Sequence, residues 1–145
     1  MREIEFRVWD GLRRGYLNKK DIAIDNLGNV FVFEGCDDND SELWYARILV
    51  DSDNERYIIE QTTGLIDKNG KDIYEGDIIV QKPLGSNKPG LRGKITYKED
   101  HAAFMFEVYE REKVVMYLFL SEFSPEKTCE VAGNIHENPE LLEEK

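Results

Sequence analysis

The sequence predicts a mostly β, α+β fold with an N-terminal β-rich subdomain over residues 1–75 and a C-terminal SH3-like barrel over residues 76–145. Short runs of β-branched and aromatic residues recur along the chain, and Gly, Pro, Asn and Asp clusters separate them. Helix signals are confined to two short segments near the C-terminus. A chain of 145 residues suits one domain or two small subdomains.

Residues 61–80, which we call the joint, organise the rest of the chain. Its Asn69-Gly70 pair predicts a type I′ turn, because both central residues of that turn need positive φ and both residue types tolerate it. Gly64 and Gly76 predict further sharp bends. The β-branched run at residues 77–80 then starts a strand, as at the beginning of many SH3-like barrels.

Before the joint, alternation of apolar and polar residues from Ile4 to Trp9 predicts a strand with one buried face. Two apolar runs flank a turn at Gly28-Asn29 and predict a hairpin. Further strands are expected over residues 43–50 and 56–60, the first on its aromatic and β-branched content. The N-terminal part should therefore be rich in strand.

After the joint, five apolar runs predict the strands of the barrel, at residues 77–80, 93–97, 104–109, 114–120 and 130–135. The Pro- and Gly-rich stretch 83–90 predicts a long exposed loop between the first two. Ser124-Pro125 and Asn138-Pro139 each place a capping residue before a proline, which predicts a single helical turn and a short C-terminal helix.

The charge balance restricts the partners. Nineteen basic and thirty acidic residues give a net charge of −11. Nucleic acid is a polyanion bound through Lys and Arg, so nucleic-acid binding is disfavoured, and a basic protein partner is favoured. The sequence has no apolar run of about 20 residues and no basic-then-apolar start, which predicts a cytoplasmic protein with no membrane contact.

No motif predicts a cofactor, a metal site or an enzyme. Cys36 and Cys129 fit no metal or redox spacing, and Cys129 is expected in the core. His101 and His136 show no paired spacing typical of zinc ligands. The acidic stretches 37–42 and 51–55 lack the order of a calcium loop and are interpreted as solvated loops.

Aromatic and polar residues near the predicted bends are the candidates for an interaction surface. Trp9, Trp44, Tyr45 and Tyr74 fit either a core or an interface, because aromatic residues dominate both. The candidate interaction surface comprises Trp9, Tyr74, Asp77, Asn134 and Glu137. For Asp77 and Asn134 the alternative is capping of backbone groups at a turn.

Three blocks of sequence resemble one known family. They are Phe6–Asp10, Thr63–Ile78 of the joint, and Glu130–Leu142. In this order they are similar to the YopX family of phage and prophage proteins. The resemblance implies a fold and a phage or prophage origin, and it implies no catalytic residues, because the family's function is undefined.

Together these observations predict a non-catalytic accessory protein of a phage or prophage that acts as a small protein-binding module in the cytoplasm of a bacterial host. Its partner would be a host or phage protein, or a second copy in a homo-oligomer. Two alternatives remain open. One is an acidic decoy that blocks a nucleic-acid site on a host enzyme, and the other is a metal-dependent hydrolase.

Overall fold

The computed structural model describes residues 3–35, 44–48 and 56–143. The chain forms two compact units, one of residues 6–60 and one of residues 1–5 and 61–145. We call them the N-terminal unit and the sheet unit. The units divide at residues 60 and 61, so the joint lies inside the sheet unit, whereas the domain boundary predicted at residue 75 stays a prediction. Strand β6, Tyr57–Ile66, contributes to both units.

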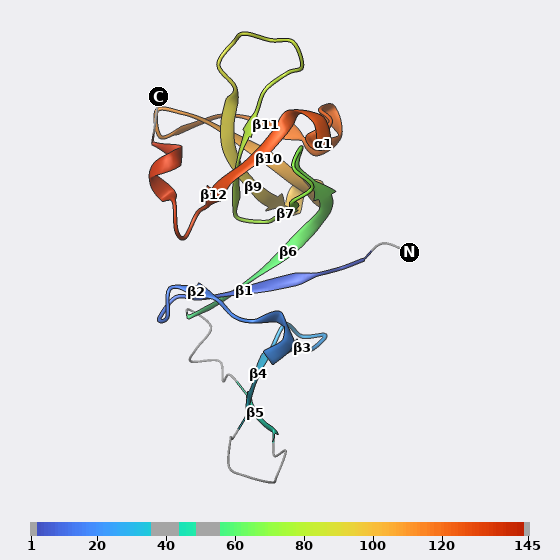
Figure 1. The fold of residues 1–145 in the computed structure, drawn as a ribbon, viewed down its shortest axis with the longest axis vertical. Helices are drawn as coiled ribbons and strands as arrows, with labels where there is room; N and C mark the ends of the chain where they lie inside the picture. The colour runs from blue at the N-terminus through green and yellow to red at the C-terminus, as the bar shows by residue number, and fades with distance from the viewer. Residues whose placement is uncertain (1–2, 36–43, 49–55, 144–145) are drawn as a thin grey trace. The chain divides into compact units, whose positions relative to one another are not determined.

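In the N-terminal unit, strands β1 (Phe6–Asp10) and β2 (Gly15–Tyr16) pair antiparallel. A separate three-stranded sheet has the order β3-β4-β5, with bounds Ile22–Ile24, Val30–Gly35 and Trp44–Ile48 (Figure 1). The predicted hairpin is confirmed, since Ile22 lies opposite Val32, and Gly28 adopts a φ of 85° in its turn. A short 3₁₀ helix, Lys19–Asp21, precedes β3.

The sheet unit holds a five-stranded antiparallel sheet that curls around a core (Figure 1). Its strand order is β11-β10-β9-β8-β12. In chain order the bounds are β8 Asp77–Gln81, β9 Leu91–Lys98, β10 Ala103–Glu110, β11 Lys113–Phe119 and β12 Cys129–Asn134. The mostly β fold is confirmed, and closure as an SH3-like barrel stays a prediction.

Helical segments in the sheet unit are short, as the sequence predicts. Helix α1 is Pro125–Thr128, with Ser124 before its proline, and the 3₁₀ helix η5 is Pro139–Leu142. The remaining 3₁₀ turns are Glu99–His101 and Leu120–Glu122. None of the helices in the described ranges is long and apolar enough to cross a membrane.

The core of the sheet unit is apolar and closely packed. Phe106 is fully buried and meets Phe123 edge to face at 5.7 Å between ring centres. Cys129 is also fully buried, which confirms its predicted place in the core, and burial raises the pKa of its thiol to about 11. Cys36 lies outside the described residues. The buried cluster is Ile73, Ile79, Ile95, Phe106, Val108, Leu120 and Cys129.

The turn of the joint differs from the predicted type I′ turn. Gly70 has a φ of 78°, as expected, but Asn69 is not among the residues with positive φ. Asp67 is the reason, because its carboxylate accepts hydrogen bonds from the backbone N–H of Asn69 at 2.8 Å and of Lys71 at 2.9 Å. The side chain thus satisfies donors that a type I′ turn would leave to solvent, and only the glycine needs the left-handed conformation. Strand β7, Asp72–Tyr74, follows and pairs with β6.

The same turn covers one edge of the five-stranded sheet. The second carboxylate oxygen of Asp67 accepts from the N–H of Val131 at 3.0 Å, and the N–H of Lys68 donates to the carbonyl of Cys129 at 2.9 Å. Both partners belong to β12, which is an edge strand. The joint therefore supplies hydrogen bonds that a further strand would otherwise make.

Candidate functional site: a groove beside the open edge of the sheet

Trp9, one predicted surface residue, lies in the N-terminal unit and is buried, with an exposed fraction of 6%. Its ring meets Tyr16 edge to face at 5.1 Å. The next residue, Asp10, is fully buried and receives two hydrogen bonds of 2.8 Å from Arg56. These bonds hold the pKa of Asp10 down at about 2, although burial acts in the opposite direction.

The other four predicted surface residues lie in the sheet unit. Tyr74 is buried, and its hydroxyl donates to Glu5 at 3.0 Å. Asp77 is buried and accepts from the N–H of Tyr74 at 2.9 Å. Asn134, opposite Asp77 across β8 and β12, is also buried. The hydrogen bond from Tyr74 agrees with the alternative interpretation of Asp77, in which its carboxylate caps a backbone N–H group at a turn.

Asn134 organises the turn that follows β12. Its amide oxygen accepts from the N–H groups of His136 and Glu137, both at 3.0 Å, and its amide nitrogen donates to the Glu137 carboxylate at 2.8 Å. Of the five predicted surface residues only Glu137 is exposed. As an interaction surface these five residues stay a prediction, and the structure points to a different part of the sheet unit.

The residues considered as metal ligands stay apart. The exposed His101 contacts Asp100 at 3.1 Å and the ring of Phe119 at 5.6 Å, whereas His136 takes part in the Asn134 turn. Across residues 3–35, 44–48 and 56–143, no three His, Cys, Asp or Glu side chains gather as a potential metal site. The acidic stretches 37–42 and 51–55 lie outside the described residues.

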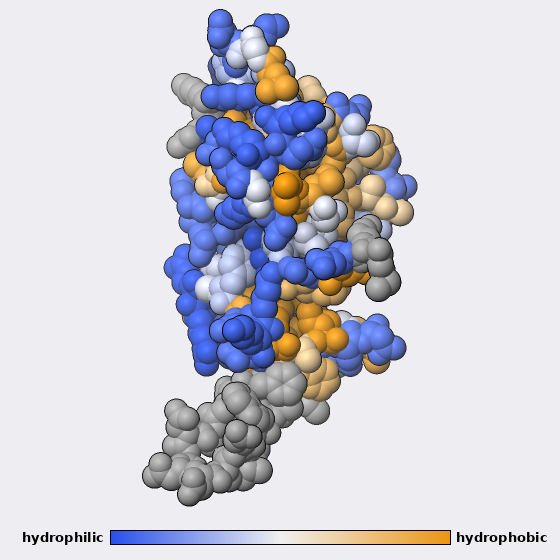
Figure 2. Space-filling model, turned by 45° about the vertical axis from the view of Figure 1, so that its right-hand side comes forward, coloured by the Kyte–Doolittle hydropathy of each residue, from blue (hydrophilic) through white to orange (hydrophobic). Residues whose placement is uncertain are grey.

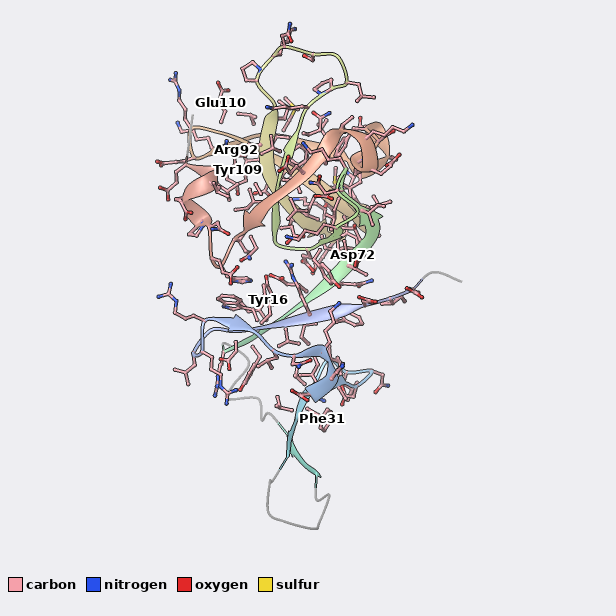
Figure 3. The ribbon with its side chains drawn as sticks, in the orientation of Figure 1. Tyr16, Phe31, Asp72, Arg92, Tyr109 and Glu110 are labelled. Carbon is pink, nitrogen blue, oxygen red and sulfur yellow. The ribbon has the colours of Figure 1, made fainter. Side chains whose placement is uncertain are left out.

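A groove of about 1030 Å³ lies in the sheet unit. One row of directly opposite residues crosses four strands and lines it: Glu130 lies opposite Val80, Val80 opposite Arg92, and Arg92 opposite Tyr109. Directly opposite residues of antiparallel strands share a face of the sheet, so this row forms a continuous surface. Figure 3 shows Arg92, Tyr109 and Glu110 near one another in this part of the sheet unit.

Cationic side chains dominate the polar lining of this groove, in a chain of net charge −11. Five cations line it against two carboxylates, Glu110 and Glu130, and Glu130 pairs with Lys68 at 2.5 Å. Arg92 donates to the carbonyl of Leu141 at 3.2 Å, which ties η5 to the groove. The cations are Lys68, Lys82, Lys88, Arg92 and Arg111.

Three of these cations have no carboxylate partner within the described part of the chain: Lys82, Lys88 and Arg111. Lys82 and Lys88 are exposed; Lys82 precedes the Pro- and Gly-rich loop predicted over residues 83–90, and Lys88 lies within that loop. Arg111 sits in the β10–β11 turn, where it and Glu112 have φ values of 49° and 65°. This is a two-residue hairpin turn built without the Asn or Gly that such φ values favour.

The hydroxyl of Tyr109, which lines the groove, is engaged by a neighbouring carboxylate. Its hydroxyl donates to Glu107 at 2.5 Å, and Lys94 lies 3.6 Å from the same carboxylate oxygen. Burial and this carboxylate raise the pKa of Tyr109, so the hydroxyl keeps its proton at neutral pH. Apart from Thr128, the remaining lining is apolar and includes Val80, Leu91, Val108, Val115 and Met116. The lining thus combines aliphatic side chains, which we call the floor, with the exposed cations Lys82, Lys88 and Arg111, which we call the rim.

The groove borders strand β11, the edge of the sheet opposite to β12. Large apolar side chains of β11 are exposed to between 40% and 48%: Val114, Val115, Met116, Tyr117 and Phe119. Figure 2 shows apolar side chains reaching the molecular surface between hydrophilic ones. Exposed single apolar residues are common, but five on one edge strand are a feature of binding surfaces.

Sequence reasoning missed this site for two reasons. The run 114–120 predicts an apolar strand, but nothing in it shows that the strand lies at an edge with its side chains exposed. The cations are spread from residue 68 to residue 111, and only the strand register gathers them. The available signal was the contrast between the apolar run at 114–120 and the loop at 83–90, which contains Lys88 and follows Lys82, in an otherwise acidic chain.

Comparisons with known proteins identify the family. The family model described as YopX protein matches residues 5–143. Protein EF1440 from Enterococcus faecalis is 28% identical, with a TM-score of 0.58 over 97% of this chain and 98% of that chain. Protein yopX from Bacillus subtilis is 21% identical, with a TM-score of 0.61 over 98% and 99% of the two chains, and it supports the fold alone. The comparison with curated proteins finds no match. Because the family model spans nearly the whole sequence, the chain belongs to the YopX family.

Proposed function

We propose that the protein is a non-catalytic protein-binding module that takes up an extended segment of a partner protein along β11, beside the groove. The observation that carries this proposal is the apolar edge strand, because β11 pairs with β10 on one side and is the end of the strand order on the other. The proposal places the protein in the bacterial cytoplasm with a phage or prophage origin, in line with the family resemblance.

An edge strand binds extended peptides by adding a strand to the sheet. Its outward backbone N–H and C=O groups supply the hydrogen bonds, and alternate side chains of the peptide enter neighbouring pockets. In β11, Met116 to Phe119 keep a regular register with Val108 to Met105, so this part of the edge is straight enough to template a new strand. The register shift opposite Val108 and Tyr109 marks where regular pairing ends.

The groove complements the edge strand. Val115 and Met116 line the groove and belong to β11, so a segment paired with the edge would place side chains over the aliphatic floor. Burial of such side chains contributes roughly 25 cal/mol per Å² of apolar area. Backbone pairing and apolar contact therefore act together on the same partner segment.

The test is selection of peptides from a random twelve-residue library on the immobilised full-length protein, followed by anisotropy titration of the selected peptides. The matched variant is Val115→Thr with Met116→Gln, which keeps side-chain size but makes the surface polar. We expect this variant to bind the selected peptides about tenfold more weakly. The control Leu65→Gln, at another exposed apolar site of the sheet unit, should bind them as the wild type does.

N-methylation of the selected peptide tests the strand-addition mode itself. In an added strand every second N–H faces the edge, so methylation should weaken binding at alternate positions only. Failure to select any peptide, or equal binding by the β11 variant, would show that β11 is not a binding surface. Loss of a homodimer in sedimentation by the same variant would instead assign the edge to a second copy of the chain.

A further inference from the structure

We infer that the partner segment is acidic, with carboxylates that meet the cationic rim of the groove while its apolar residues pack on β11. This inference rests on the proposed function and specifies the chemistry of the partner. It reverses the expectation from net charge, because a chain of −11 favours basic partners in general. The lining of the groove has the opposite balance, with five cations and two carboxylates.

The distribution of charge in the lining carries the inference. Glu130 is engaged by Lys68, so of the two carboxylates only Glu110 remains against Lys82, Lys88 and Arg111. Like charges gathered around one hollow repel each other, and an anionic ligand relieves that repulsion. The guanidinium of Arg111 also provides a two-pronged donor for a carboxylate.

The position of the cations agrees with an extended ligand. Lys82 follows β8, Lys88 precedes β9, and Arg111 precedes β11, so all three lie at one end of the strands that line the groove. A segment paired with β11 passes this end as it leaves the strand. Its acidic residues would therefore lie to one side of its apolar residues, which is a specific pattern for the peptide sequence.

A peptide fits the groove better than a nucleic acid does. Single-stranded nucleic acids are bound on aromatic side chains that stack with successive bases. The groove has one aromatic residue, Tyr109, among several aliphatic ones. A polyanion would also meet the acidic remainder of the chain, whereas a peptide with two or three carboxylates touches only the rim.

The experiment compares two double variants of the full-length protein that change net charge equally. Lys82→Gln with Lys88→Gln neutralises the rim, and Lys71→Gln with Lys127→Gln neutralises two exposed lysines that do not line the groove. The peptides are those selected on the wild type. We expect them to be rich in Asp and Glu beside an apolar run, and to bind the rim variant about fivefold more weakly than the control variant.

Salt and competition complete the test. Affinity of wild type should fall between 50 and 500 mM NaCl, and the fall should be smaller for the rim variant. Selected peptides that are neutral or basic, or that bind both double variants alike, would overturn the inference and leave strand addition in place. Selection of no peptide would overturn both. Tighter binding of a twelve-nucleotide single strand that competes with the peptides and depends on Lys82 and Lys88 would overturn the inference in favour of nucleic acid.

Discussion

The two edges of the five-stranded sheet are treated in opposite ways by the chain. At β12, the joint turn donates from Lys68 and accepts through Asp67, so the edge is satisfied from within the molecule. At β11, apolar side chains are exposed and the strand is the last in the sheet. Natural sheets protect their edges against unwanted pairing. The contrast between a covered edge and an apolar, uncovered one is the basis of the proposal that β11 binds a partner segment.

The largest effect is expected from a substitution that disrupts the pairing of β9 with β10, which lies between the two edges of the sheet. A Cβ at Gly93 in β9 would lie 2.0 Å from the carbonyl oxygen of Glu107 in β10, and two backbones cannot separate without breaking the pairing. Gly93→Ala should therefore destabilise the protein by about 4 kcal/mol or more. Urea unfolding followed by fluorescence measures this.

The control is Gly15→Ala, where a Cβ meets nothing within 4 Å, and which should change the free energy of unfolding by no more than about 0.5 kcal/mol. If both glycine variants had the same stability as the wild type, the β9–β10 pairing would be looser than described. The two edges could then not be treated as belonging to one sheet.

Removing the cover of β12 should have the second largest effect. Asp67→Ala leaves the N–H groups of Asn69, Lys71 and Val131 without their acceptor in a buried site. We expect a loss of about 3 kcal/mol in urea unfolding and faster hydrogen exchange at Val131. Asp67→Asn keeps one neutral oxygen acceptor and should lose less. An Asp67→Ala protein as stable as the wild type would show that β12 does not need the joint.

The pH dependence of stability provides a second test of the hydrogen bonds by which Asp67 covers β12. Burial would raise the pKa of Asp67, but hydrogen bonds from Val131, Lys71 and Asn69 outweigh it and lower the pKa below its ordinary 3.8. A lowered folded-state pKa means that the carboxylate stabilises the fold fully above 3.8 and loses this contribution as pH falls through the folded-state value. The stability difference between wild type and Asp67→Asn should therefore shrink from pH 6 to pH 3.

The smallest effect on stability is expected at the β10–β11 turn, which precedes the edge strand β11. Arg111 and Glu112 hold positive φ values that suit Asn and Gly, so Arg111→Asn with Glu112→Gly should stabilise the protein by about 1 kcal/mol. Thermal unfolding would show a higher midpoint. The variant also removes one rim cation, so its peptide affinity should fall even as its stability rises. Unchanged stability would indicate that the turn carries no strain.

The strands were predictable because their residues are β-branched or aromatic and glycine and proline mark their ends. The type I′ turn at Asn69-Gly70 was predicted wrongly, because local sequence does not reveal that Asp67 will capture two N–H groups of the turn and one of a strand 64 residues away. A type I′ turn instead forms at Arg111-Glu112, which has no typical turn residue. The sequence therefore predicted the strands and turns, but not the side-chain hydrogen bonds that determine the type of a turn.

The candidate site depended on register rather than on local pattern. Arg92 and Tyr109 are far apart in the chain and become neighbours because β9 and β10 pair at that register. A shift of one residue in this pairing would place the two side chains on opposite faces of the sheet. No local signal in a single sequence fixes that register, which is why the cations of the groove could not be grouped beforehand.

The bond between Asp67 and Val131 joins residues 64 positions apart, which has a consequence for the order of folding. During synthesis the joint leaves the ribosome before β12 does. Until β12 emerges, the Asp67 carboxylate therefore lacks the hydrogen bond from the N–H of Val131. Until then β8 also lacks its neighbour, and the growing sheet has two unprotected edges instead of one. Strand β12 is thus the strand that completes this sheet, and removal of residues 129–134 would leave β8 as a second unprotected edge that favours aggregation.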